Sequence, residues 1–127
     1  CMFQAWTPQQ RTEMVVALTG WNTTFMELWL ASERAYDMAR AFNAREGLDA
    51  TQDRVHPRFS RPLPGGPAAG KAPTEAEYDR AMRKFYGMMG WDPVTAVPTR
   101  AKLEDLDLEW VADLLEAKAG PPAAPEK

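Results

Sequence analysis

The sequence predicts an all-α fold, a small irregular helical bundle of four to five helices with one long Pro/Gly-rich loop. Apolar residues recur every three or four positions in several segments, which is the period of a helix. Two of these segments open with a threonine followed three residues later by a glutamate, the capping-box signature of a helix start. No segment alternates polar and apolar residues as a β-strand does.

The first helix is predicted to begin after Thr7, with Pro8 in its first position, because threonine caps helices and proline fits the first turn. Gly20 is predicted to end it. Its apolar positions at helical spacing are Met14, Val15 and Leu18.

The second helix is the clearest element, opening with the capping box of Thr24 and Glu27 and ending at Gly47. One face carries a stripe at helical spacing, and we expect that stripe to pack into the core. Its members are Phe25, Leu28, Trp29, Ser32, Tyr36, Ala39 and Asn43.

Residues 48–73 form the long loop, because they hold five prolines and three glycines and show no periodicity. A loop of this length is uncommon in a compact domain, so it is either disordered or lies against a surface that this chain lacks. Phe59 and Leu63 are apolar anchors that favour partial docking near residues 53–63. The stretch 64–73 is the more mobile part by composition.

A third helix is predicted after the capping box of Thr74 and Glu77, ending before Gly90-Trp91-Asp92-Pro93. Its stripe is Tyr78, Ala81, Met82, Phe85, Tyr86 and Met89. A short helix with Leu103 and Leu106 and a last helix from about Leu108 to Lys118 follow. The domain is therefore expected to span residues 1–118, with a disordered tail at 119–127.

Composition excludes several classes of protein. The formal net charge is -3 and no helix carries a basic stripe, which argues against nucleic acid and against a DNA-recognition helix. No apolar run reaches the roughly 18 residues that a membrane helix needs, and no signal peptide is present. We therefore expect no membrane partner and a cytoplasmic location.

Only two residues carry soft or imidazole chemistry, Cys1 and His56. Together they are too few for a self-contained thiolate or imidazole metal site. From composition alone, Cys1 is either an iron ligand that needs three more cysteines from elsewhere or simply a terminal thiol. His56 lies beside Pro57 without an obvious partner and is interpreted as a solvated loop histidine. Because the chain begins at a cysteine, we expect it to be a piece of a longer chain.

Charged side chains gather in two places. Glu104, Asp105, Asp107 and Glu109 form an acidic run that helix ends and the surface explain. The second group either pins the loop or forms a surface network, and the two readings stay equally open. That group is Asn43, Arg45, Glu46, Asp53, Arg58 and Arg61.

Several phrases resemble, in order and spacing, the C-terminal domain of the aldehyde ferredoxin oxidoreductase family over roughly residues 1–115. They are Leu18-Thr19-Gly20-Trp21, Thr24 with Glu27-Leu28, Ser32-Glu33-Arg34, Phe42-Asn43-Ala44-Arg45-Glu46-Gly47, the set of Asp53, Val55, Arg58, Phe59 and Pro62-Leu63, then Tyr86, Gly90-Trp91-Asp92, Pro98-Thr99 and Leu103. The chain departs from the family at Ser32, where glycine is usual, at Gln52 and at His56-Pro57.

The resemblance implies a tungsten- or molybdenum-bis-pterin cofactor, a 4Fe-4S cluster, oxidation of an aldehyde to an acid, and ferredoxin as electron acceptor. It also implies that Cys1, with Phe3 two residues on, is the fourth cluster ligand, the other three coming from upstream domains of the same polypeptide. No catalytic residue is carried over. The isolated fragment is expected to hold no cofactor and to be inactive. The alternative is a free-standing helical protein-interaction module without catalysis.

Overall fold

The computed structural model describes residues 3–119 and contains five α-helices, with no strand in that range. The helices are α1 Pro8–Thr19, α2 Phe25–Arg45, α3 Glu75–Met89, α4 Arg100–Asp105 and α5 Glu109–Ala119. The predicted fold class is thereby confirmed. The tail expected at 119–127 lies, apart from helical Ala119, outside the described residues.

Local signals set the helix ends as the sequence predicts. Complete capping boxes open α1, α2 and α3, in which the Oγ1 atoms of Thr7, Thr24 and Thr74 each accept a backbone N–H three residues on. Gly20 ends α1 and Gly90 ends α3, both in the left-handed conformation that glycine adopts without strain.

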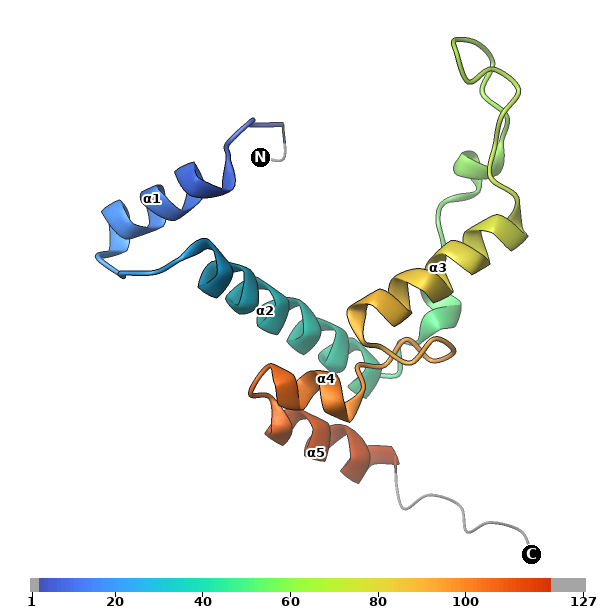
Figure 1. Ribbon diagram of the computed structural model, residues 1–127. Coiled ribbons are helices and arrows are strands. Elements are labelled where there is room, and N and C mark those ends of the chain that lie inside the picture. Colours follow the sequence, from blue (N-terminus) through green and yellow to red (C-terminus); the bar gives the residue numbers. More distant parts are fainter. Residues whose placement is uncertain (1–2, 120–127) are drawn as a thin grey trace, which may run out of the picture.

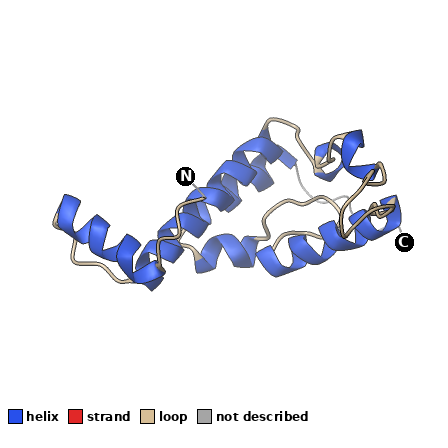
Figure 2. Ribbon diagram, turned by 90° about the horizontal axis from the view of Figure 1, so that it is seen from above, coloured by secondary structure: helices blue, strands red, loops and turns tan. Residues whose placement is uncertain are grey.

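The helices form an open arrangement (Figure 1). α2 and α3 diverge from a common base, α4 and α5 pack beside the C-terminal half of α2, and α1 lies apart from α3. Seen from above, helices and loops account for the whole described chain (Figure 2). The base, where α2, α3 and α4 meet, is where most buried residues lie.

The core consists of two small clusters. One joins α2 to α4 and α5 and contains Ala41, Leu103, Leu106, Leu108, Val111 and Ala112. The other contains Tyr86, Trp91 and Ala96, flanked by Ala50, Met82 and Met89. The leucines predicted for the short helix, Leu103 and Leu106, are therefore in the core.

The apolar stripe predicted to bury α2 does not do so. Trp29 and Tyr36 are each 52% exposed, and Phe25 is 38% exposed. The buried residues of α2 are instead Asp37, Arg40 and Ala41. α4 and α5 pack on the face that carries Ala41, so the aromatic face is left toward solvent in this chain.

On α3 the predicted stripe is buried only in part. Tyr86 is buried and Met82 and Met89 pack against the second cluster, whereas Ala81 and Phe85 are exposed. None of the other helices packs closely along α3 within residues 3–119, so part of its stripe is left without a partner.

The loop 48–73 contains more local structure than its composition predicts. Short 3₁₀ turns occupy Ala50–Gln52 and Pro57–Ser60, and Leu63 bridges to Ala69. From residue 54 to 73 the chain projects beyond the start of α3, and we call this segment the arm (Figure 1). The expected anchors Phe59 and Leu63 are 64% and 51% exposed, so they do not dock within residues 3–119.

Candidate functional site

The predicted cluster ligand Cys1 lies outside the described residues, so its role stays a prediction. Within residues 3–119 no three His, Cys, Asp or Glu side chains gather as a metal site would require. His56 is exposed, and its Nδ1 accepts the backbone N–H of Arg58 over 3.1 Å. The interpretation of His56 as a solvated loop residue is therefore confirmed.

The structure instead assembles a buried polar cluster at the base, starting from Asp37. Its side chain is fully buried, and its Oδ1 accepts the indole N–H of Trp91 over 2.6 Å. Its other oxygen, Oδ2, is buried without a hydrogen-bond partner. Burial raises the pKa of Asp37 because the ionised form loses water, and the Trp91 bond opposes this only in part.

Arg40, one turn further along α2, ties three segments together. Its Nε donates to the carbonyl of Ala96 over 2.7 Å, and Nη1 donates to Asp53 Oδ1 over 3.0 Å. Nη2 lies 2.8 Å from Asp53 Oδ2, an ion contact without hydrogen-bond alignment. A buried arginine is stable only with such a set of acceptors, so these contacts fix α2 against the loop and the turn after α3.

Ala96 is held in an unusual backbone conformation to make this contact. Its φ is 59°, in the left-handed region that residues with a Cβ rarely adopt, and its side chain is fully buried. The surrounding turn supports it, because Ala96 N–H donates to Asp92 O over 2.8 Å. The Asp92 side chain accepts from Val94 and Thr95, and these backbone bonds lower the pKa of Asp92.

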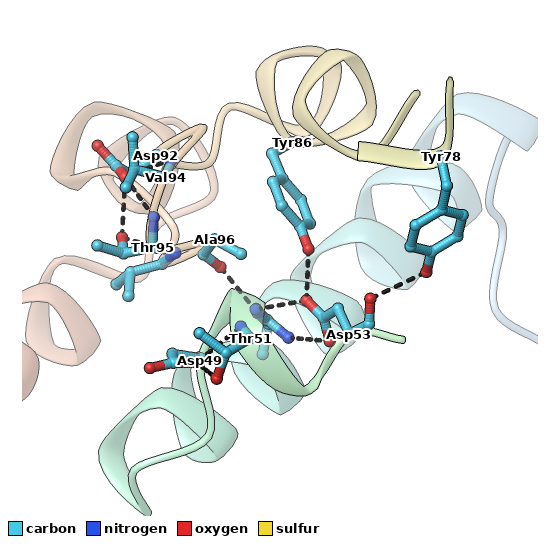
Figure 3. Close-up of polar contacts among 11 residues, drawn as sticks. Asp49, Thr51, Asp53, Tyr78, Tyr86, Asp92, Val94, Thr95 and Ala96 are labelled. Carbon is cyan, nitrogen blue, oxygen red and sulfur yellow. Dashed lines mark hydrogen bonds and ion pairs between the residues drawn. The ribbon is translucent and has the colours of Figure 1, made fainter. Parts of the chain in front are cut away.

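Asp53 also accepts hydrogen bonds from two tyrosines of α3, Tyr78 and Tyr86 (Figure 3). Tyr86 Oη donates to Asp53 Oδ2 over 2.7 Å, and Tyr78 Oη donates to the Asp53 carbonyl over 2.9 Å. Burial together with the Asp53 carboxylate holds the pKa of Tyr86 well above its usual range. Tyr86 is thereby kept protonated as a donor, and α3 is fixed at the point where the loop leaves the core.

Aromatic rings cover the cluster. Trp91 stacks on Tyr36 with ring centroids 5.6 Å apart and on Tyr86 at 6.1 Å. The Arg40 guanidinium lies 5.2 Å from the Trp91 ring centroid, which favours the cation through the electron-rich ring face. Because the ion pair is shielded in this way, its charges are screened less by solvent than those at the surface.

Two hollows adjoin the cluster, of about 250 and 470 Å³, and both are lined by Asp53, Arg54, Tyr78 and Tyr86. Arg54 is paired with Asp79 over 2.9 Å. Asp53, Arg54 and Asp79 at the hollows are thus in ion pairs, whereas Arg83, which also lines the smaller hollow, forms none within residues 3–119. No nucleophile with an adjacent base lines them, and the arrangement serves to position helices and the arm rather than to transfer protons.

The sequence reasoning found Asp53 but missed its partner. Six residues were predicted either to pin the loop or to form a surface network. Of these, Asp53 forms an ion pair with Arg40, and Arg45 forms one with its neighbour Glu46. Arg58 and Arg61 form no ion pair within residues 3–119. The available signal was a charged residue beside the aromatic stripe of α2, since Arg40 follows Tyr36 by four positions, about one helical turn.

The acidic run at the end of the chain has the surface role expected of it. Arg100 contacts Glu104, Asp113 and Glu116, all of them exposed. Asp107 pairs with Arg34 over 3.1 Å in the same way. No acidic residue of this run enters the buried cluster.

Among the residues that the structure describes, no helix is long and apolar enough to cross a membrane.

Comparison with known proteins places the fold in a family. A family described as aldehyde ferredoxin oxidoreductase, domains 2 and 3, matches residues 1–108. The chain is 29% identical over 98 residues to the tungsten-containing aldehyde ferredoxin oxidoreductases of Pyrococcus furiosus and Thermococcus kodakarensis, covering 76% of this chain and 16% of each relative. It is 32% identical over 99 residues to an aliphatic sulfonate oxidoreductase, WOR-like subunit, of Pyrococcus furiosus, covering 72% of this chain and 16% of the relative.

The chain therefore spans about one sixth of the length of these relatives. Because the family match extends over most of the sequence, the chain belongs to the aldehyde ferredoxin oxidoreductase family.

Proposed function

We propose that this chain is the C-terminal helical part of an enzyme that oxidises an aldehyde to a carboxylic acid and passes the electrons to ferredoxin. The observation that carries the proposal is the family match over residues 1–108, since Cys1 and the buried cluster both fall inside it. The names of the tungsten-containing relatives support the reaction class. We expect the enzyme to be cytoplasmic.

The cofactors of the proposed enzyme are a tungsten- or molybdenum-bis-pterin and a 4Fe-4S cluster. When bound, the pterin metal supplies two-electron oxidation and the cluster supplies a one-electron route to ferredoxin. Thiolate is the ligand that such clusters take, so Cys1 is the residue of this chain whose chemistry fits. The three remaining cysteines would come from upstream domains of the same polypeptide.

In this proposal the described residues act as a wall. The Asp37–Trp91 and Arg40–Asp53 contacts hold α2, α3 and the turn between α3 and α4 in one arrangement. A positioned wall excludes water from a redox site and keeps a ligand on a neighbouring segment in place. Substrate chemistry would depend on residues outside this chain.

The proposal is tested in the full-length parent protein with Cys1→Ser. We expect the variant to lose iron and acid-labile sulfide and the electron paramagnetic resonance signal of the reduced cluster, because serine does not replace a cluster thiolate well. Met2→Ser, which changes the neighbouring residue, is the matched control and should keep them. A Cys1→Ser protein with a full complement of iron, sulfide and signal would exclude Cys1 as the ligand.

The alternative, a free-standing interaction module, draws support from the exposed aromatic face of α2, including Trp29. The coding sequence upstream of Cys1 distinguishes the two. A long upstream frame with a Cys-x-x-Cys-x-x-x-Cys phrase supports the enzyme, whereas a start codon at Met2 supports the module. The aliphatic sulfonate relative makes a sulfonate the second substrate class to assay.

A further inference from the structure

The arm, residues 54–73, differs in charge from the rest of the chain. Its basic residues are Arg54, Arg58, Arg61 and Lys71, and no Asp or Glu occurs between Asp53 and Glu75. The whole chain has a formal net charge of -3, so the remainder is strongly acidic. The net charge of the whole chain therefore does not reveal this cationic segment.

Three of the four arm cations have no partner in the described part of the chain. Arg54 pairs with Asp79 at the base of the arm. The side chains of Arg58, Arg61 and Lys71 form no ion pair within residues 3–119. They line a hollow of about 720 Å³ together with Phe59 and Leu63. The arm thus presents cations around exposed apolar side chains, the composition typical of the centre of a protein interface.

The arm has a defined conformation before any partner binds. Gly70 N–H donates to Leu63 O over 2.9 Å, and Ala69 N–H donates to Gly66 O over 3.0 Å. Five prolines restrict its backbone further. Its base is tied to the core through Asp53. A segment ordered in advance loses little conformational entropy when it docks.

We propose that the arm docks on an acidic surface, with an apolar centre, of the remaining part of the same parent polypeptide. This inference rests on the proposed function, since it requires a parent of which this chain is one part. The relatives extend far beyond the one sixth that this chain spans, so such a surface has ample chain to come from.

Charge favours an occupant within the same polypeptide over a separate protein. This chain as a whole is negative, so its net charge provides no long-range attraction for a separate acidic protein or a nucleic acid. A surface in the same polypeptide is held at high effective concentration and needs no long-range attraction. The exposed side chains of Phe59 and Leu63 also favour a surface in the same polypeptide, because permanent interfaces are more apolar than transient ones.

Hydrogen exchange of the full-length protein tests the docking. The amides of Gly65 and Gly66, at the tip of the arm, donate to no acceptor within residues 3–119. We expect both to exchange slowly in the parent, since a docked surface shields them, and chymotrypsin not to cut after Phe59. Raising the salt concentration to 1 M should speed exchange at both, because it screens the ion pairs.

Charge reversal provides the second measurement. We expect the amides at the tip to exchange about tenfold faster, and chymotrypsin to cut after Phe59, in the variant Arg58→Glu/Arg61→Glu/Lys71→Glu, because its arm is repelled by an acidic surface. Arg83→Glu/Lys84→Glu, on the exposed surface of α3, is the matched control and should behave as the unmodified protein. Carbodiimide coupling should join Lys71 to a carboxylate of the same polypeptide, identified by mass spectrometry.

Rapid exchange at the tip of the unmodified protein would overturn the proposal. So would a charge-reversed arm that stays protected, or coupling of Lys71 only to a second copy of the chain or to an added acidic electron carrier. The iron and sulfide content of the Cys1→Ser protein is independent of these results. A failure of the docking proposal can therefore be told apart from a failure of the proposed function.

Discussion

The indole N–H of Trp91 donates to Asp37 Oδ1 over 2.6 Å, joining the turn after α3 to the middle of α2 inside the core. The two residues are 54 positions apart in sequence. Asp37 is fully buried and keeps one oxygen unpartnered, so the carboxylate is held at a cost in desolvation.

Asp37→Asn should reduce the dependence of stability on pH. The pKa of Asp37 is raised in the folded state. Its contribution to the free energy of unfolding is therefore fully present below the pKa of the unfolded state and is lost as the pH rises through the pKa of the folded state. Asparagine keeps an acceptor for Trp91 but does not ionise. Urea unfolding should therefore give the variant a free energy of unfolding at pH 7 equal to or above that of the unmodified chain.

On acidification the free energy of unfolding of the unmodified chain should rise relative to that of Asp37→Asn. Asp105→Asn, at an exposed position with no ion pair within residues 3–119, is the control and should show no such change between pH 7 and acid. An Asp37→Asn variant that is less stable at pH 7, with unaltered pH dependence, would show that the ionised form is favoured in the core.

Trp91→Phe should be far more destabilising than Trp110→Phe. The first removes the donor to Asp37 and leaves a buried carboxylate without a partner, which costs about 1–3 kcal/mol before lost packing is counted. Trp110 is 55% exposed and donates no such bond to the part of the chain that the structure describes. Urea unfolding is measured for both variants and for the double variant Trp91→Phe/Asp37→Asn. The loss of unfolding free energy caused by Trp91→Phe should be smaller when Asp37 has already been replaced by neutral asparagine. Strict additivity in this cycle would contradict the coupling.

Arg40→Met and Arg100→Met should differ because one ion pair is buried and the other is exposed. Loss of Arg40 leaves the Ala96 carbonyl without its donor and Asp53 with only the Tyr86 hydroxyl, and breaking a buried pair costs about 3–5 kcal/mol. Arg100 contacts three carboxylates, but all are solvated, so its loss should cost far less than the loss of Arg40.

Salt gives the check on this pair of variants. The effect of Arg100→Met should vanish in 1 M salt, where exposed charges are screened, while that of Arg40→Met persists. Equal losses for the two variants in denaturant titrations at low salt would count against the buried role of Arg40.

Thr24→Ala should remove the cap of α2 and cost about 1 kcal/mol. Thr24 Oγ1 accepts the Glu27 N–H, and Glu27 in turn accepts from Thr24, which lowers the pKa of Glu27. A lowered carboxyl pKa contributes stability above the unfolded pKa that is lost as the pH falls through the folded value. Thr24→Ala should therefore lose less stability on acidification than the unmodified chain. Ser32→Ala, within the same helix, is the control, and thermal unfolding followed by circular dichroism measures both.

The positions of the helices were predictable from the sequence because helix ends depend on neighbours in the chain. Thr7, Thr24 and Thr74 cap their helices through residues three positions away, and Gly20 and Gly90 end theirs through their own backbone freedom. The family was likewise predictable, since phrases such as Gly90-Trp91-Asp92 can be read in order along the chain.

Tertiary structure alone decided which face of α2 is buried. A helical period marks the face that carries Trp29 and Tyr36, but it does not say whether the partner of that face lies in this chain. Asp37 can be buried only because Trp91, distant in sequence, donates a hydrogen bond to it in the core. Arg40 can be buried only because Asp53 and the Ala96 carbonyl accept its hydrogen bonds there. A buried charge is stable only where such partners converge, and that convergence exists in the folded chain and not in any local stretch of sequence.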